Sequence, residues 1–323
     1  MTTSALFFNK NMKGRENMTS SYPVGRFAPT PSGRMHLGNV FAALIAWLSV
    51  RSRDGTLVLR MEDLDTQRTS DEFARVLRED LLWLGLDWDR ETQPQSKRSD
   101  VYEKYFDILK EKDLLYPCYC TRSQLHSVNA PHLSDGTYVF AGTCRDLTEA
   151  QRAAFDRKPS WRVKVPDKLW TVEDLCQGTY TENLATDCGD FVVRRADGVF
   201  VYQLAVTVDD GEAGVSEVVR GMDLLSSSPR QMYLQSLFGF PHPQYGHVPL
   251  LLAPDGRRLS KRDQDLDLGA LRQRMKAEDL IGSLAHTAGL IDKAEAISAK
   301  ELAAEFRWEN LAKENICIDS ALL

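Results

Sequence analysis

Residues 22–39 lay a strand, a tight turn and a helix end to end, in the sequence Tyr-Pro-Val-Gly-Arg-Phe-Ala-Pro-Thr-Pro-Ser-Gly-Arg-Met-His-Leu-Gly-Asn. Residues 24–28 predict a short buried strand, and residues 29–33, dense in Pro and Gly, predict a turn. From Leu37 the apolar residues have helical spacing, which continues through residues 40–50. This order aims the first free N–H groups of the helix, and the positive end of its dipole, at an anion above the strand.

The side chains around this turn suit a nucleotide. His36 and Asn39 add hydrogen-bond donors, and Gly38 has no Cβ to keep a ligand from the backbone. Phosphates would lie over the helix start, with a flat base against the glycine. Taken alone, the four residues 36–39 would more often cap a helix than carry catalysis.

The order of several motifs along the chain favours a catalytic role for residues 36–39 over a simple helix cap. The sequence His36-Leu-Gly-Asn39 resembles the His-x-Gly-x motif of class I aminoacyl-tRNA synthetases, and residues 26–33 resemble its glutamate branch. Further segments follow in the order of that family: Arg-Met-Glu-Asp-Leu-Asp at 60–65, residues 202–210, Val-Arg-Gly at 219–221 and Arg-Leu-Ser-Lys-Arg at 258–262. The resemblance covers residues 22–263. It implies an α/β protein with a class I synthetase-type Rossmann nucleotide-binding core, an inserted acceptor-end-like module and a short helical C-terminal tail.

The chain is expected to divide into five segments. These are a flexible leader at 1–21, the first half of the Rossmann core at 22–115, an inserted zinc and acceptor-like module at 116–190, the second half of the core with the Arg-Leu-Ser-Lys-Arg loop at 191–265, and a helical stem-contact-like tail at 266–323. Periodicity predicts strands at 55–60, 161–165, 170–172, 199–208, 215–219 and from 249, and helices at 71–86, 102–112, 268–276, 277–288 and 299–306. Residues 190–198 are expected to return the chain to the main sheet.

Composition narrows the class of protein only a little. The 323 residues have room for about two domains, and 43% hydrophobic with 27% charged residues is typical of a soluble globular protein. No apolar run approaches the ~20 residues of a membrane span, so no membrane association is expected. A net charge of −6 argues mildly against a nucleic-acid partner, although a local basic face is compatible with it. Six cysteines are too few for a disulfide scaffold, which favours a reducing compartment, the cytoplasm.

The resemblance implies a glutamate site. Its residues would be Arg26, Ala28, Thr30, Glu62, Tyr202 and Arg220. The chemistry agrees, because planar guanidinium groups bind carboxylates with two hydrogen bonds, and the carboxylate of Glu62 would offset an ammonium group. The alternative for Arg220 is an ion pair with Glu217 or Asp223.

The resemblance also implies an ATP site. Residues 258–262 resemble the Lys-Met-Ser-Lys-Ser motif, with Arg258 in place of its first Lys, and Lys261 would face the phosphates. The implied ATP-binding residues are His36, Gly38, Asn39, Ser260 and Lys261, of which His36, Asn39 and Lys261 would be catalytic, with Mg²⁺. A basic surface loop is the alternative for residues 258–262.

Three cysteines indicate a metal site. Cys118-Tyr-Cys120 and the later Cys144 could bring three thiolates onto one zinc ion, which favours four tetrahedral ligands. In the resembling family a Cys-x-Cys pair with a later Tyr-x-x-x-Cys often binds zinc, but here Phe140 stands four residues before the last cysteine and Tyr138 stands six before it. The expected ligands are Cys118, Cys120, Tyr138 and Cys144. A water molecule or His132 as fourth ligand, and three free cysteines without metal, are the alternatives.

The resemblance extends to shortened relatives of glutamyl-tRNA synthetase, since no anticodon-binding domain is expected after the helical tail. It implies activation of L-glutamate with ATP without tRNA, and transfer of the glutamyl group to the queuosine base in the anticodon loop of tRNA(Asp), by a monomer. The alternatives are a short synthetase that charges the 3′ end of tRNA(Glu), and a catalytically degenerate paralogue that binds tRNA. The intact motif residues count against the degenerate case.

Overall fold

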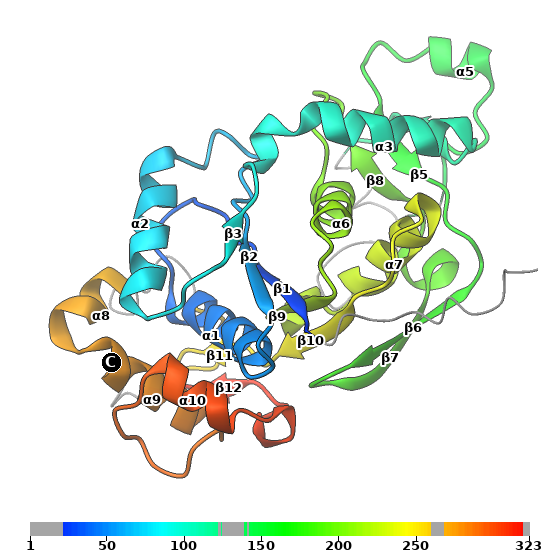
Figure 1. The fold of residues 1–323 in the computed structure, drawn as a ribbon. Helices are drawn as coiled ribbons and strands as arrows, with labels where there is room; N and C mark the ends of the chain where they lie inside the picture. The colour runs from blue at the N-terminus through cyan, green and yellow to red at the C-terminus, as the bar shows by residue number, and fades with distance from the viewer. Residues whose placement is uncertain (1–21, 122–123, 125–138, 141, 260–267, 319–323) are drawn as a thin grey trace, which may run out of the picture.

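A seven-stranded sheet forms the centre of the molecule (Figure 1). The computed structural model describes residues 22–121, 124, 139–140, 142–259 and 268–318. The strands, in spatial order, are β3 (Arg90–Glu91), β2 (Thr56–Leu59), β1 (Val24–Phe27), β9 (Glu217–Gly221), β10 (Gln244–Val248), β6 (Leu169–Asp174) and β7 (Gly178–Asn183). All neighbours pair in parallel except β6 with β7. The carboxyl ends of the parallel strands therefore meet at one edge, where open α/β sheets bind ligands.

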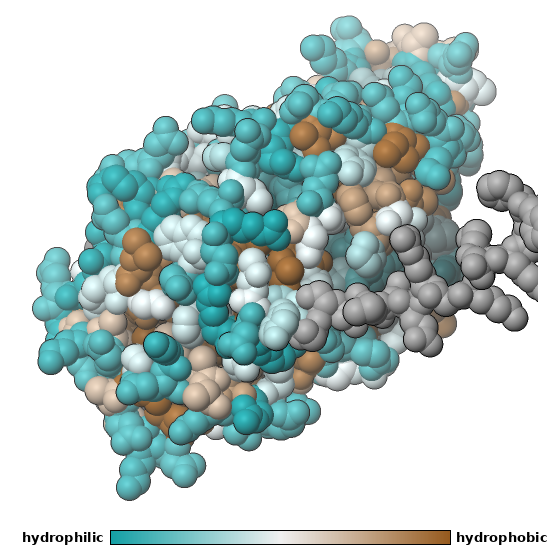
Figure 2. Space-filling model, in the orientation of Figure 1, coloured by the Kyte–Doolittle hydropathy of each residue, from teal (hydrophilic) through white to brown (hydrophobic). Residues whose placement is uncertain are grey.

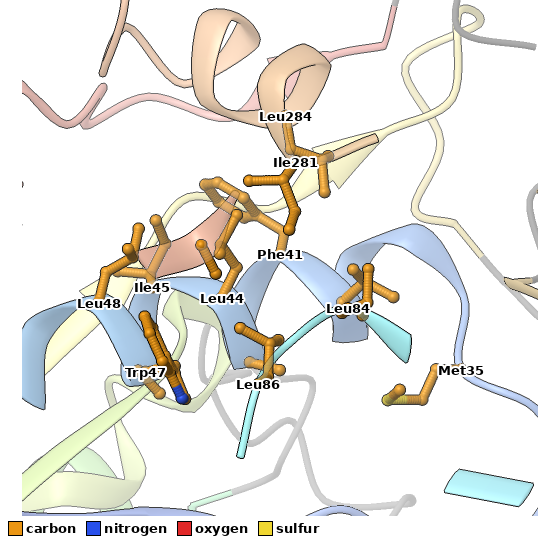
Figure 3. Packing of buried hydrophobic residues seen from close by; sticks show 14 of the residues in the cluster. Met35, Phe41, Leu44, Ile45, Trp47, Leu48, Leu84, Leu86, Ile281 and Leu284 are labelled. Carbon is orange, nitrogen blue, oxygen red and sulfur yellow. The ribbon is translucent and has the colours of Figure 1, made fainter. Parts of the chain in front are cut away.

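Helix α1 (Leu37–Arg51) is buried along most of its length. It contacts β1, β2 and β9 on the sheet, and β11 (Leu251–Leu252) and α10 (Ala299–Glu305) of the C-terminal part. Figure 3 shows Ile281 and Leu284 of α9 close to Phe41 of α1. Phe41 is only 1% exposed, and burial of such a side chain stabilises the fold by about 1.5–3 kcal/mol. The helix that follows the first turn is thus held on both sides.

The other elements surround this layer. The helices are α2 (Asp71–Trp83), α3 (Ser99–Glu111), α5 (Glu149–Ala153), α6 (Tyr202–Glu212), α7 (Ser227–Phe238), α8 (Leu268–Arg274), α9 (Ala277–Thr287) and α10 (Ala299–Glu305). Short helical turns are η1 (Gln95–Lys97), η2 (Leu184–Cys188), η3 (Met222–Leu224) and η5 (Trp308–Asn310). A small parallel pair joins β11 (Leu251–Leu252) to β12 (Ile316–Cys317).

Most predicted elements are present. The first strand, turn and helix are confirmed as β1 and α1, and the three helices predicted in the tail are confirmed as α8, α9 and α10. Helix α2 begins as its sequence indicates, because the Ser70 side chain accepts a hydrogen bond from the Phe73 N–H at 3.1 Å. It ends before Gly85, whose φ of 72° suits glycine.

One predicted strand is wrong: residues 199–208 do not form a strand, because Tyr202–Glu212 is helix α6. The helix is buried over residues 204–210, so its apolar residues run continuously instead of marking one face. A short apolar run of this kind does not distinguish a buried strand from a buried helix. As a result, Asp209 and Asp210 lie inside a helix and not at the end of a strand.

The expected return of residues 190–198 to the main sheet is also wrong. Strand β8 (Phe191–Arg194) instead pairs with β5 (Ser160–Val163), and β5 pairs with β4 (Leu115–Cys118), in a separate antiparallel sheet. The hairpin β6–β7, which belongs to the expected insertion, extends the main sheet beside β10. Short strands carry no local signal for the sheet edge on which they pair, because register depends on distant partners.

The face of the molecule shown in Figure 2 is mostly hydrophilic. On the side shown in Figure 2, hydrophobic residues form small separate patches among hydrophilic ones. Among the described residues, no helix combines the length and the apolar character needed to span a bilayer. The expected leader, residues 1–21, lies outside the described part of the chain, and the division into five segments stays a prediction.

Candidate active site

A cavity of about 540 Å³ opens at the carboxyl edge of the main sheet. It is lined by the turn after β1, the start of α1, the start of α6 and the segments that follow β2, β9 and β10. Nine residues expected at the glutamate and ATP sites line this one cavity: Arg26, Ala28, Thr30, His36, Gly38, Asn39, Glu62, Tyr202 and Arg220. Ser260 and Lys261 lie outside the described residues, although the preceding Arg258 and Leu259 line the cavity.

His36 stands at the start of α1. Its backbone is extended, with φ −85° and ψ 167°, and its N–H donates to Asn39 Oδ1 at 3.4 Å. A Cβ on Gly38 would lie 3.1 Å from Nδ1 and Cε1 of His36, so the imidazole ring rests against the glycine. Any larger residue at position 38 would move this ring. The positive end of the α1 dipole and the His36 side chain therefore face the same cavity.

Arg220, near the end of β9, is a buried cation held by neutral groups. It is 6% exposed. Its guanidinium donates to His247 Nε2 at 3.0 Å, Tyr202 Oη at 3.3 Å, Gln231 Oε1 at 2.9 Å, Leu224 O at 3.2 Å and Ser228 Oγ at 2.8 Å. Within the described chain, no carboxylate oxygen comes within 4 Å of this guanidinium.

Both alternative ion pairs for Arg220 are therefore wrong. Glu217 pairs with Arg53 and accepts a hydrogen bond from the Ser49 hydroxyl, and Asp223 lies 3.6 Å from Arg258. A buried cation without a carboxylate partner is costly unless an anion arrives. Because Arg220 borders the cavity, the natural anion is one that enters the cavity.

Arg60 connects two other carboxylates of the site. Its guanidinium is fully buried and donates from Nη1 to Asp210 Oδ1 at 2.6 Å and from Nη2 to Glu62 Oε1 at 3.1 Å. Asp210 also lies 3.6 Å from Nε of Arg26, which donates from Nη1 to the Val219 carbonyl at 2.8 Å. Two strand ends and one helix are thereby fixed relative to one another.

The pKa values within this network move in opposite directions. Burial raises the pKa of Glu62, although the charge of Arg60 acts against it. Burial also acts to raise the pKa of Asp210, but the nearby Arg60 and Arg26 outweigh it and lower this pKa. Burial lowers the pKa of Arg26 more than the attraction of Asp210 raises it. Asp210 therefore stays ionised, while Glu62 is the carboxylate most ready to gain stabilisation from an incoming cation.

Sequence reasoning missed several residues that support the cavity: Arg60, Asp210, Gln231, Ser228 and His247. A signal existed for Asp210, because two adjacent aspartates ended an apolar run, and for Arg60, which opens a recognised motif. No pattern around His247 pointed to the site, since residues 244–248 were not predicted as a strand.

Three thiols meet away from the cavity. The Sγ atoms of Cys118, Cys120 and Cys144 all lie within 4.8 Å of one another, and those of Cys120 and Cys144 are 3.5 Å apart. Arg162 donates from Nε to Cys118 Sγ at 3.3 Å. Burial acts to raise the pKa of Cys118, but the guanidinium charge and hydrogen bonds lower it. The donor set fits three of the four positions of a tetrahedral zinc site.

The fourth position of that site stays a prediction. Tyr138 and His132 lie outside the described residues. Phe140, which stands where the family pattern has tyrosine, has its ring 3.7 Å from the Arg162 guanidinium carbon. Phe140 packs with Cys118 and Cys144 in one buried cluster, and its side chain has no ligand atom.

Comparison with known proteins identifies the family. A family model described as tRNA synthetases class I (E and Q), catalytic domain, matches residues 24–322. The chain belongs to this family, and the predicted α/β fold of the class I synthetase type is confirmed.

Curated relatives are more specific. A protein from Nitratidesulfovibrio vulgaris named Glutamyl-Q tRNA(Asp) synthetase is 45% identical over 280 residues, which cover 83% of this chain and 86% of the relative. One of the same name from Symbiobacterium thermophilum is 43% identical over 308 residues, covering 91% of this chain and 95% of the relative. Among solved structures, a glutamate tRNA ligase from Elizabethkingia meningosepticum in complex with its amino acid superposes with a TM-score of 0.79 at 26% identity, covering 94% of this chain and 68% of that one.

Proposed function

We propose that this protein activates L-glutamate with ATP and transfers the glutamyl group to the queuosine base in the anticodon of tRNA(Asp). The observation that carries the proposal is that Arg220 and Glu62 line the same cavity. Arg220 is a buried cation with only neutral partners among the described residues. The names of the relatives at 42–45% identity support the same reaction.

The cavity suits glutamate better than an uncharged amino acid. Glutamate carries two carboxylates and one ammonium group, and the cavity offers Arg26, Arg220 and Glu62. Each guanidinium can donate two hydrogen bonds to a carboxylate that lies in its plane, and Tyr202 can donate one further hydrogen bond. Glutamine lacks the second negative charge, so one buried arginine would remain without an anion. Ala28 and Thr30 complete the expected amino-acid site from the turn after β1.

ATP is expected at the other end of the cavity. His36, Gly38 and Asn39 would hold the nucleotide at the start of α1, and Ser260 and Lys261 would reach the phosphates from the loop that follows Leu259. Mg²⁺ would neutralise phosphate charge when bound. The catalytic part of His36, Asn39 and Lys261 would be to stabilise charge on the α-phosphate and the leaving pyrophosphate.

The acceptor is the most specific part of the proposal. Unpaired anticodon bases can be splayed out and read directly by a compact protein. The expected inserted module and the helical tail would contact the tRNA stem, and zinc held by Cys118, Cys120, Cys144 and Tyr138 would stabilise the module. We further expect a monomer in the cytoplasm.

One observation favours a second function: a solved structure similar to this one is a glutamate tRNA ligase. Under this alternative the protein would charge the 3′ end of tRNA(Glu). Periodate oxidation of the terminal ribose, with the queuosine diol protected, separates the two functions. The proposal requires glutamylation of tRNA(Asp) to survive oxidation.

Glutamate-dependent exchange of labelled pyrophosphate into ATP, with and without tRNA, tests the activation step. We expect exchange without tRNA. Incorporation of labelled glutamate only into tRNA(Glu) with an intact 3′ end would overturn the queuosine assignment and leave the activation step standing. No exchange under either condition would overturn the activation step.

A further inference from the structure

Two side chains that do not line the cavity connect Arg220 to the rest of the sheet. His247 of β10 accepts a hydrogen bond from Arg220 Nε, with the two nitrogen atoms 3.0 Å apart. The other ring nitrogen, Nδ1, lies 2.6 Å from Oδ2 of Asp174, the last residue of β6. The side chains of His247 and Asp174 are both fully buried. An unbroken chain of contacts therefore runs from the inserted hairpin to the arginine of the cavity.

The carboxylate of Asp174 is itself fixed by the backbone. Its Oδ1 accepts hydrogen bonds from the N–H groups of Cys176 and Gln177, each at 2.9 Å, and from the His247 N–H at 3.0 Å. A carboxylate has only acceptors to offer, so Nδ1 of His247 must carry the proton in this contact. Nε2 is then left with a lone pair, which is what the Arg220 Nε–H requires.

We propose that Asp174 and His247 are positioning residues of the amino-acid site, in which Asp174 selects the His247 tautomer that holds the Arg220 guanidinium plane toward the cavity. The inference rests on the proposed function, because it takes Arg220 as a ligand of the substrate carboxylate. It adds two residues that do not touch the substrate, one of them from the hairpin β6–β7.

The planar shape of the guanidinium explains why Arg220 needs residues that fix its orientation. A guanidinium binds a carboxylate well only when the two planes coincide, and rotation about the side chain removes that match. Nε is the donor nearest the backbone, so an acceptor there limits the rotation, together with the acceptors that hold Nη1 and Nη2. Tyr245 adds a packing restraint, with its ring 5.5 Å from the Arg220 guanidinium carbon and stacked at 5.9 Å on His247.

A matched pair of substitutions at position 247 separates positioning from general stability. In His247→Gln the longer amide can place its oxygen where Nε2 lies and accept from Arg220. In His247→Asn the shorter amide can still donate to Asp174, but it does not reach Arg220. Both variants carry the same functional group, so a difference between them reports the contact with Arg220.

The readouts are KM for glutamate, KM for ATP and kcat in pyrophosphate exchange, with glutamate affinity by calorimetry and the unfolding midpoint of each variant. Loss of one hydrogen bond from a buried charged donor predicts a rise of about tenfold or more in KM and Kd for glutamate in His247→Asn, with KM for ATP unchanged within about twofold. His247→Gln is expected to stay within about threefold of the native values. Equal glutamate KM values in the two variants, or an equal rise of both KM values in His247→Asn, would overturn the inference.

Asp174→Asn tests the tautomer independently. The backbone N–H groups of Cys176 and Gln177 require the amide oxygen, so the amide nitrogen faces His247 and donates to Nδ1. The imidazole proton then moves to Nε2, where it opposes the Arg220 N–H, and we expect a rise in glutamate KM similar to that of His247→Asn. A native glutamate KM in folded Asp174→Asn would contradict the role of Asp174. Absence of glutamate-dependent exchange in the native enzyme would instead contradict the proposed function, so the two failures are distinguishable.

Discussion

The guanidinium of Arg60 donates from Nη1 to Oδ1 of Asp210 at 2.6 Å, and the two side chains are 0% and 4% exposed. This contact joins the residue that follows β2 to the interior of α6. Because Asp210 also lies beside Arg26, which lines the cavity, this one carboxylate contacts two cations. Arg220 receives no such compensation from the described residues.

The first prediction concerns this contact. Asp210→Asn keeps the shape of the side chain but removes the carboxylate nearest to Arg60 and the one beside Arg26, and loss of one partner of a buried ion pair typically costs about 3–5 kcal/mol. We expect the free energy of unfolding in urea to fall by that amount. Glu103→Gln is the matched control, because Glu103 pairs with Arg194 at the surface, and such a pair contributes less than about 1 kcal/mol. Equal losses in the two variants would contradict the buried network.

The second prediction concerns catalysis. Removal of one positioned donor that stabilises transition-state charge typically lowers the rate by ~10²-fold or more. We expect His36→Ala and Lys261→Ala each to lower kcat for pyrophosphate exchange by about that factor, with little change in glutamate binding. Arg257→Ala, which removes an exposed charge paired with Asp255, serves as the control. Near-native exchange in Lys261→Ala would remove Lys261 from the catalytic set.

The third prediction concerns the metal. The cluster of Cys118, Cys120 and Cys144 is expected to hold one zinc ion per chain, measured by metal analysis of purified protein. Replacement of both Cys118 and Cys120 by Ser should abolish it, whereas Cys317→Ser, at an exposed cysteine, should retain it. Tyr138→Phe should weaken zinc retention against a chelator if Tyr138 is the fourth ligand. Zinc that is missing from the native protein, or retained by the double variant, would refute the site.

The fourth prediction is a pH dependence of stability. Burial lowers the pKa of His247 to about 4, although the hydrogen bond that His247 donates to Asp174 acts in the opposite direction and the charge of Arg220 adds to the lowering. In the unfolded chain the ordinary pKa is near 6.5, so between these values the unfolded state binds more protons. The stability due to neutral His247 is complete above about pH 6.5 and is lost as the pH falls toward 4.

The size of this effect is about 3 kcal/mol, because the pKa of His247 falls from about 6.5 in the unfolded chain to about 4 in the folded protein. Urea unfolding of the native protein should therefore lose about that much more stability between neutral pH and about pH 4 than unfolding of His247→Gln, which has no imidazole. Carboxylates other than Asp174, which contacts His247, titrate in both proteins and cancel in the comparison. Parallel loss of stability in both would show that His247 is not held neutral.

The parts of the site predicted from sequence are those encoded by short segments. The turn before α1 brings His36, Gly38 and Asn39 together within a few residues, so local chemistry sufficed. Arg220 and Tyr202 were predicted as site residues and both line the cavity, although the element predicted for Tyr202 was wrong, because motif order does not depend on secondary structure. The fold class depended on the same motifs and is confirmed.

What could not be predicted depends on distant pairing. Asp174 and His247 are 73 residues apart, and they meet only because β6 aligns beside β10. Nothing local in residues 169–183 indicates whether that hairpin joins the main sheet or the smaller sheet of β4, β5 and β8. For the same reason the buried contact between Arg60 and Asp210, 150 residues apart, was visible in the sequence only as two polar groups among apolar neighbours.

The pairing of β6 with β10 also determines which part of the molecule unfolds locally at the lowest free energy. The hairpin β6–β7 is an edge of the sheet, yet Trp170 within it is buried and packs at 5.8 Å against Tyr233 of α7. We therefore expect amide protons of β6 and of His247 to exchange with solvent as one cooperative unit, at a lower opening free energy than those of α1. Each such opening separates Asp174 from His247. We therefore expect Arg220 to lose its ability to bind a carboxylate under conditions in which the rest of the fold is still intact.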